Sequence, residues 1–375
     1  MEQAKEKVDS PEAVGPERYF VPFGQLRRQP TIVVDSTGLG AALTLAHWRG
    51  AATPLALRDD TSAGSCLRAL HAPATPGLEA RAVTANHFDI DGFIGVWALL
   101  HPALALAHEA LLRLTAALGD FRELDYQHPL ADHALRLACW LNAEEKACFY
   151  EPFGAPARRR REDEASAEKF TWFLPRFAEI ILNPEVSRAA WEPEYLRVRQ
   201  ALVRLQPPAD DRRGALTQRT DYPAIGLVVI RTPEPVPYYA LFGPTAGFDW
   251  VLSLYDGQRY ELECKYTTWI DLESRPTLPR LPLAPLAIRL NELETGPFRW
   301  AADQLTDTGP LLRLAGRRLT KAERYADPDG RPIYASSLAA SVVAAEVVAF
   351  LQNGYAGVQP RKYWTWAEVR AVNNG

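Results

Sequence analysis

The stretch His87-Phe-Asp-Ile-Asp-Gly92 carries one imidazole and two carboxylates at alternate positions. In an extended backbone, residues i, i+2 and i+4 lie on one face, so these side chains are expected to converge where a strand ends. Gly92 allows the backbone to turn sharply after them. Carboxylates and an imidazole form a hard ligand set that suits Mn²⁺ or Mg²⁺. The pattern therefore predicts a divalent metal site, and two such ions about 3.5–4 Å apart can activate water and clamp a phosphoryl oxygen.

A purely structural interpretation of the same residues stays open. Asp89 and Asp91 could cap the following helix or form an Asx turn, and His87 could be a hydrogen-bonded loop residue. The two interpretations differ in where the side chains point. A metal site requires them to face one cleft beside another carboxylate.

The surrounding sequence predicts the elements that position this motif. A short β-type run (82–85) precedes it and an apolar helical run (93–100) follows it. Open α/β sheets present their site residues in this order, at the carboxyl edge of the strands. Upstream, Thr-Ile-Val-Val predicts a buried strand that delivers Asp35 to a turn, and GLGAALTLAHW indicates a helix of small residues.

Further ligands are expected near the ends of the next helices. Asp120 follows a strongly helical segment (103–118), where a carboxylate is free to reach the site. His128 and Asp132 are four residues apart and would face the same side of one helix. The Asp125/His128 and Asp132/His133 pairs are candidate ligands, although a polar helix face is the favoured interpretation of them. The alternative for Asp120 is a residue at a helix end that faces solvent, and the alternative for Asp35 is a turn residue.

The segment VTANHFDIDGFIGVWALL resembles the first motif of the DHH phosphoesterase superfamily, which places H-x-D-x-D after a strand and before a helix. That superfamily consists of two-domain, metal-dependent hydrolases of phosphodiester, phosphoanhydride or related bonds. The resemblance implies that His87, Asp89 and Asp91 are metal ligands. The family's Asp-His-His tripeptide is absent, and the nearest substitutes are Asp125-x-x-His128 and Asp132-His133. About 85 residues precede the motif, and the whole chain also resembles an uncharacterised bacterial family.

The second half reads as a series of β-rich runs, with Asp256-Gly257 as a hairpin turn signal. The expected fold class is α/β: an open, largely parallel sheet with helices, followed by a smaller mixed α+β domain. We expect a flexible lead-in (1–30), an α/β domain with the metal site (31–205) and a mixed-sheet substrate domain (224–375). The boundary falls in the Pro-, Gly- and charge-rich stretch 206–223.

Substrate-binding groups are expected in this second half. Lys265, Arg275 and Arg280 make a candidate anion clamp, because Arg fits phosphate oxygens bidentately, although surface ion pairs explain them equally well. Thr308-Gly309 resembles a backbone anion-binding loop. Strand alternation puts Lys265 on one face with Glu261 and Glu263, and an exposed face is the simpler interpretation of the two glutamates.

Composition excludes several classes of protein. The 375 residues carry 42 basic and 46 acidic side chains, which argues against a large nucleic-acid partner, whereas short single strands stay open. Charge, Pro or Gly interrupts every apolar run before the roughly 18–20 residues that a membrane helix needs. The start of the chain has no apolar core like that of a signal peptide, and the four scattered cysteines fit a reducing compartment, so a cytoplasmic location is expected. All seven histidines precede residue 134.

These observations lead to one function hypothesis and one alternative. The first is a hydrolase of a phosphate ester or anhydride that acts on a small phosphorylated substrate with Mn²⁺ or Mg²⁺. Its candidate catalytic residues are Asp89, Asp91 and Asp120, and its candidate metal ligands are these three with His87, His128 and Asp132. The alternative is a non-catalytic nucleotide- or protein-binding module with a degenerate site.

Overall fold

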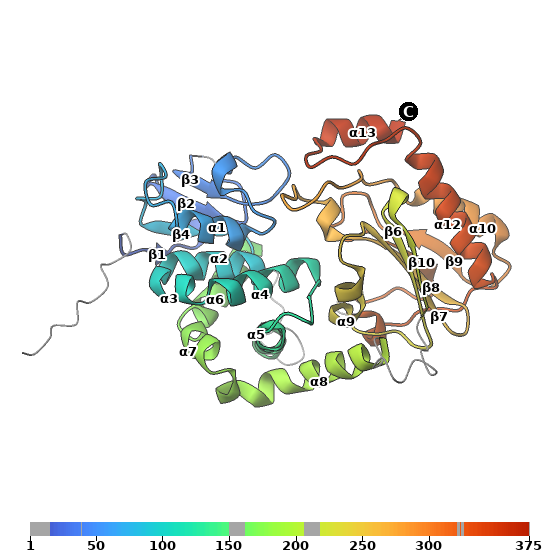
Figure 1. Ribbon diagram of the computed structural model, residues 1–375, viewed down its shortest axis with the longest axis horizontal. Helices are drawn as coiled ribbons and strands as arrows, with labels where there is room; N and C mark the ends of the chain where they lie inside the picture. Colours follow the sequence, from blue (N-terminus) through green and yellow to red (C-terminus); the bar gives the residue numbers. More distant parts are fainter. Residues whose placement is uncertain are drawn as a thin grey trace, which may run out of the picture.

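The computed structural model describes residues 16–38, 40–149, 162–205, 218–320, 323 and 326–374. Figure 1 shows two lobes, each built around a sheet: an N-terminal lobe (described residues 16–205) and a C-terminal lobe (described residues 218–374). The expected α/β class is confirmed. Most of the expected boundary (206–217) and half of the expected lead-in (1–15) lie outside the described residues.

The sheet of the N-terminal lobe has four parallel strands in the order β1-β4-β2-β3. They are β1 (Tyr19–Phe20), β2 (Thr31–Val34), β3 (Leu43–Leu45) and β4 (Ala82–Thr84). The expected helix in GLGAALTLAHW is wrong: its Leu-Thr-Leu core is β3, which pairs with β2 through Ile32 and Leu43. The β-favouring Leu-Thr-Leu run, fully buried against β2, outweighs the helical propensity of the neighbouring alanines.

Helices cover this sheet and extend away from it toward the other lobe (Figure 1). They are α1 (Ser62–Leu70), α2 (Ile90–Leu100), α3 (Pro102–Ala107), α4 (Glu109–Phe121), α5 (Ala131–Phe149), α6 (Glu162–Phe173), α7 (Phe177–Leu182) and α8 (Arg188–Leu205). Helix α2 is buried along nearly its whole length. Gly95 makes this possible, because a Cβ there would lie 2.7 Å from a methyl group of Val34 on β2.

The sheet of the C-terminal lobe has six strands in the order β5-β6-β7-β8-β10-β9. They are β5 (Gln218–Tyr222), β6 (Leu227–Thr232), β7 (Trp250–Tyr255), β8 (Arg259–Cys264), β9 (Arg299–Ala302) and β10 (Leu311–Ala315). The pair β6–β7 is parallel and the others are antiparallel, which confirms a mixed sheet. The expected hairpin joins β7 and β8, and Gly257 adopts the left-handed conformation that the turn requires (φ 72°).

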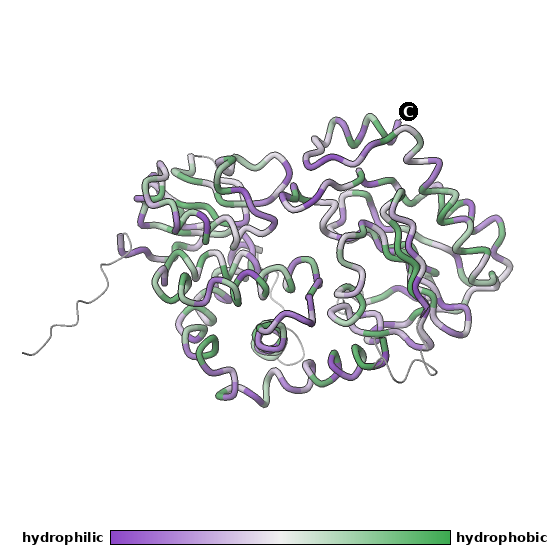
Figure 2. The backbone as a smooth tube through the Cα atoms, viewed as in Figure 1, coloured by the Kyte–Doolittle hydropathy of each residue, from purple (hydrophilic) through white to green (hydrophobic). Residues whose placement is uncertain are grey.

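Helices α10 (Ala284–Leu293) and α12 (Ala340–Gly354) lie on one face of this second sheet, and α9 (Tyr238–Phe242) lies on the other (Figure 1). Helix α13 (Trp366–Asn374) is near the end of the chain. Figure 2 shows hydrophobic residues along the central strands and hydrophilic stretches along the loops. Among the described residues, no helix combines the length and the apolar character that crossing a membrane requires.

Candidate metal site

Six ligand-type side chains meet at the carboxyl edge of the parallel sheet. We call them the Asp/His cluster: Asp35, His47, His87, Asp89, Asp91 and Asp120. Strands β2, β3 and β4 end just before Asp35, His47 and His87 respectively. Because parallel strands end at one edge, residues from distant parts of the sequence come together there.

Asp35 occupies the centre of the cluster. It directly follows β2, is fully buried, and has a positive φ of 46°, a conformation that costs energy for a residue with a side chain. Its Oδ1 accepts a hydrogen bond from the Ser62 hydroxyl (2.7 Å), and its Oδ2 lies 3.1 Å from Nε2 of His87. Burial acts to raise the pKa of Asp35, but the two neighbouring histidines outweigh it and lower that pKa to about 2.

His47 was missed by the sequence analysis, because its segment was predicted to be a helix. Its Nδ1 lies 2.6 Å from the Asp60 carbonyl oxygen, so Nδ1–H donates there and Nε2 faces the cluster. Nε2 is 3.5 Å from Oδ1 of Asp35, 3.8 Å from Oδ2 of Asp91 and 3.3 Å from Oδ2 of Asp120. The sequence signal for this residue is its position just after the run Leu-Thr-Leu-Ala, which is compatible with a short strand that ends beside a histidine.

His87 and Asp89 form a second side of the cluster, where Asp89 has two roles. Its Oδ1 accepts the Gly92 N–H (2.8 Å) and caps α2, as the structural interpretation expects. Its Oδ2 accepts from Nε2 of His87 (2.8 Å), while Nδ1 of His87 is 2.6 Å from the Asn86 side-chain oxygen. Burial acts to lower the pKa of His87, but the Asp89 and Asp35 carboxylates raise it to about 12.

Asp91 lies beneath the others in the first turn of α2. The expectation that the three motif residues share an extended face is therefore wrong, because α2 already begins at Ile90. The two oxygens of Asp91 accept the N–H groups of Ser62 (2.7 Å) and Ala63 (2.8 Å) at the start of α1. Complete burial raises the pKa of Asp91 to about 7 despite these bonds.

Asp120 completes the cluster from the last turn of α4. The preceding Gly119 lets α4 pack closely on α2, since a Cβ there would lie 2.4 Å from Cβ of Ile90. The buried Oδ2 of Asp120 has no hydrogen-bond partner among the described residues. Burial, with the charges of Asp91 and Asp89, raises the pKa of Asp120 well above its ordinary value.

The cluster fits divalent cations. Two sets of ligand atoms lie within 4.8 Å of one another, Asp35–His47–Asp91 and Asp35–His87–Asp89, and they share Asp35. Among the described residues, Oδ2 of Asp120 has no hydrogen-bond partner, and a cation would satisfy this buried oxygen. Within the part of the chain that the structure describes, these are the sets that could hold a metal ion.

The cluster opens into a cavity of about 470 Å³ between the two lobes. The N-terminal lobe contributes Trp48, His87, Asp89 and Asp120, and the C-terminal lobe contributes Glu263, Tyr266, Trp269, Thr308 and Gly309. The sequence-predicted loop at Thr308 and Gly309 therefore faces the same cavity as three residues of the cluster. The Tyr266 hydroxyl lies 3.4 Å from Nε2 of His47.

The three basic side chains predicted to bind the substrate, Lys265, Arg275 and Arg280, do not line this cavity. Each forms hydrogen bonds or an ion pair with other groups of the protein. Lys265 contacts the Glu123 carboxylate, and Arg275 pairs with Asp249 (2.7 Å). Arg280 is fully buried and donates to the backbone carbonyls of Leu305, Asp307 and Thr308, so it holds the loop that reaches the cavity.

Glu261 and Glu263 are 3% and 6% exposed, so the exposed-face interpretation of these glutamates is wrong. Glu261 is held by two guanidinium nitrogens of Arg331 (3.0 and 2.7 Å). Arg331 of the same lobe contacts Glu261 and Arg122 of the N-terminal lobe contacts Glu263, which strand alternation alone does not reveal.

The remaining sequence candidates lie outside both ligand sets. Asp132 accepts a hydrogen bond from the Tyr195 hydroxyl and pairs with Arg136 (2.8 Å). Nδ1 of His128 accepts the Leu130 N–H (3.1 Å) in the turn that precedes α5. These contacts match the interpretation of this segment as a polar helix face.

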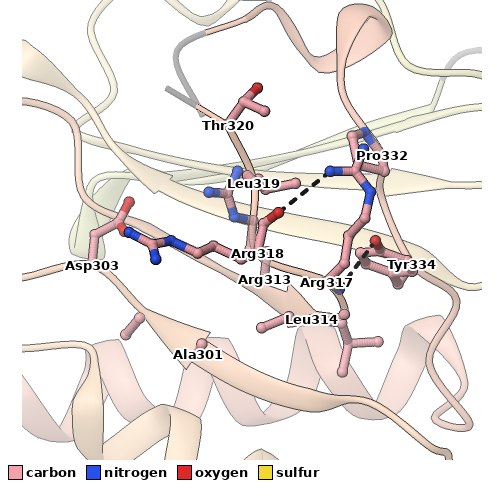
Figure 3. Close-up of a pocket in the computed structure, with 13 residues that line it drawn as sticks. Ala301, Asp303, Arg313, Leu314, Arg317, Arg318, Leu319, Thr320, Pro332 and Tyr334 are labelled. Atoms are coloured by element: carbon pink, nitrogen blue, oxygen red, sulfur yellow. Dashed lines mark hydrogen bonds between the residues drawn. The ribbon is translucent and has the colours of Figure 1, made fainter. Parts of the chain in front are cut away.

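Another cavity, of about 570 Å³, lies on the C-terminal lobe beside β9 and β10 (Figure 3). Arg313, Arg317 and Arg318 line it. Arg317 pairs with both oxygens of Glu323, and Arg313 lies 3.9 Å from Oε1 of Glu261. Two of its three guanidinium groups thus have carboxylate neighbours, and this cavity contains neither of the two metal-ligand sets.

Comparison with known proteins gives a family but no activity. No curated protein matches the chain, and no solved structure matches it. The model of a family of unknown function, DUF6687, matches residues 16–362, which include every residue of the Asp/His cluster and the cavity. The chain therefore belongs to this family of unknown function, DUF6687.

Proposed function

We propose that this protein is a metal-dependent hydrolase of a phosphate ester or anhydride, with Mn²⁺ or Mg²⁺ as its cofactor. The observation that carries the proposal is the pair of ligand sets that share Asp35 at the edge of a cavity between two lobes. The four carboxylates are hard oxygen ligands of the kind these cations prefer, and the two imidazoles add nitrogen donors. A shared carboxylate between two sets is typical of two-metal hydrolytic sites.

The residues divide into two proposed positions. Asp35, His87 and Asp89 would hold one cation beside the cavity, and Asp35, His47 and Asp91 would hold a second one deeper. Asp120, whose Oδ2 lies 3.3 Å from Nε2 of His47, is the additional ligand of the deeper position. When bound, such cations supply activation of water and polarisation of a phosphoryl oxygen.

The protein's own groups orient these ligands. The Asp60 carbonyl fixes the tautomer of His47, and the N-terminus of α1 holds both oxygens of Asp91. Outer contacts of this kind are what keep metal ligands in a productive orientation. The Thr308-Gly309 loop, fixed by Arg280, would contact the substrate from the opposite side.

The cavity favours a small phosphorylated substrate. Its volume suits one small molecule, and Trp48 and Trp269 provide flat apolar surface. Arg122 lines it, but its guanidinium lies 3.4 Å from Glu263 and over the Tyr238 ring. The H-x-D-x-D resemblance to DHH phosphoesterases supports the same class of reaction.

The experiment measures metal content and hydrolysis together. The purified protein, loaded with Mn²⁺ and desalted, is expected to retain up to two ions per chain and to hydrolyse p-nitrophenyl phosphate or its bis ester. Asp35→Asn should lose both properties, since Asn tolerates the left-handed backbone but offers a weaker ligand. Asp132→Asn makes the same chemical change outside the cluster and should retain both.

Each outcome has a meaning. Retention of Mn²⁺ by Asp35→Asn at the wild-type level would refute the assignment of the site. Metal binding without turnover of any phosphate ester or anhydride would favour the alternative, a non-catalytic binding module.

A further inference from the structure

Four consecutive residues at the end of α4 connect the Asp/His cluster to the C-terminal lobe. Asp120 belongs to the cluster, and the next three residues all contact the other lobe. Figure 1 shows α4 pointing from one lobe toward the other. The Phe121 ring packs in a small apolar cluster with Ile270 and Leu272.

Arg122 fixes the turn that ends the helix. It adopts a left-handed conformation (φ 56°), which is uncommon for a residue with a side chain. Its guanidinium lies 4.0 Å from the centre of the Tyr238 ring, and its Nη1 lies 3.4 Å from Oε1 of Glu263. A cation over an aromatic ring and beside a carboxylate holds this conformation in place.

Glu123 forms the third contact, with Lys265. The Lys265 side chain is 1% exposed, and its Nζ donates to the Glu123 carboxylate and to the Thr245 carbonyl oxygen (3.1 Å). Lys265 is one of only seven lysines, and burial of an ammonium is costly unless it is paired. The pair therefore fixes the segment after α4 against the end of β8.

We infer that Lys265 and Glu263 are positioning residues, through which the C-terminal lobe sets the place of the Asp120 carboxylate and so the affinity of the metal site. The inference rests on the metal binding proposed above. The three residues that follow Asp120 along the chain all contact the other lobe. By linkage, metal binding and the docking of the lobes through residues 121–123 then strengthen each other.

The test is a double-mutant cycle on Mn²⁺ affinity in the full chain, measured by competition with a chelating dye. Lys265→Met should weaken Mn²⁺ binding about 10–100-fold, as loss of an outer contact of a ligand does. In the Asp120→Asn background, the same substitution should change the affinity less than about 2-fold, because the ligand through which it acts is already gone. A merely structural role would give the same factor in both backgrounds.

Two further variants control the experiment. Glu123→Gln is a milder change of the same pair and should weaken Mn²⁺ binding in the same direction, which keeps the inference testable if Lys265→Met folds poorly. Arg197→Met removes a different contact between the lobes, the ion pair of α8 with Asp327 and Asp329, and should leave the affinity unchanged.

The outcomes separate this inference from the proposed function. Wild-type protein that binds no Mn²⁺ refutes the proposed function. Wild-type protein that binds Mn²⁺, with equal affinity in Lys265→Met and Glu123→Gln, overturns only the inference. Equal weakening by Arg197→Met would also overturn it, because lobe contact in general would then be responsible.

Discussion

Metal affinity should rise steeply with pH, because at least two of the proposed ligands hold protons that a cation must displace. Nε2 of His87 carries a proton at neutral pH, since the neighbouring carboxylates, acting against burial, raise the pKa of His87 to about 12. Burial raises the pKa of Asp91 to about 7, so this carboxyl group is about half protonated at pH 7. Coordination needs both groups in their deprotonated form.

The magnitude follows from these two pKa values. Between pH 6 and pH 8, His87 stays protonated in the free protein, so the small fraction of deprotonated His87 that can bind a cation increases about 100-fold. Asp91 titrates within this interval and adds about tenfold. The overall association constant for the two Mn²⁺ ions, which is the product of the two binding constants, should therefore increase about 1,000-fold, and binding at pH 7 should release about 1.5 protons from these two groups.

Calorimetric titration in two buffers of different ionisation enthalpy measures both quantities. The slope of the logarithm of the overall association constant for both ions against pH should be about 2 near pH 6 and about 1 near pH 8. His87→Asn should lower the slope by about 1 throughout. An affinity that stays constant from pH 6 to pH 8 would refute the roles given to both residues.

Other predictions follow from the same contacts. The pKa of Asp91 is raised on folding, so its contribution to stability is fully present below the unfolded pKa of about 4 and is lost as pH rises through about 7. The free energy of unfolding of the metal-free protein should therefore fall by about 2 kcal/mol from this group between pH 5.5 and 8. Urea titrations at these two pH values measure the change. Asp120→Asn should stabilise the metal-free protein by about 1 kcal/mol at pH 8, because it removes a buried carboxyl that lies among other carboxylates, while weakening Mn²⁺ binding. Arg280→Met should raise KM for a phosphate ester with little effect on bound metal, since this side chain holds the loop opposite the cluster and contacts no residue of the cluster; lost metal would contradict that role. Arg331→Met should destabilise the protein by about 3–5 kcal/mol, because it leaves Glu261 buried with only the more distant Arg313 beside it (3.9 Å), and adding Glu261→Gln should recover part of the loss.

The sequence predicts the fold class and the local site better than the long-range contacts. Strand β2 and the motif after β4 could be predicted because apolar runs ending in a polar turn have few other structures available. His47 could not, because three residues of β3 give too little periodicity to outweigh the surrounding alanines. His128 and Asp132 show the opposite error, because the sequence analysis includes them in the site and the structure places them outside both ligand sets. Helical spacing predicts that two residues share a face, but it does not predict which neighbour that face contacts.

The cation candidates failed for a related physical reason. Side-chain type indicates that a guanidinium or ammonium needs acidic partners, but it does not say whether those partners are substrate or protein. For Lys265 and Arg275 the partners are Glu123 and Asp249, both distant in sequence. Only the tertiary contacts distinguish an anion clamp from a contact between lobes.

Three energetically unfavourable features of the fold lie together in the Asp/His cluster, and this supports a functional role for the cluster. Asp35 holds a left-handed backbone, Asp91 is a fully buried carboxylate, and Asp120 has a buried oxygen without a hydrogen bond. Each of these features disfavours folding, yet all three meet within one cluster, and each carboxylate is oriented by well-formed bonds or close packing. Such costs concentrate at functional sites rather than spreading through a core. A divalent cation bound to these oxygens would neutralise Asp91 and supply a partner to Asp120, whereas a cluster that only capped helices would leave the Asp120 oxygen without a counterpart.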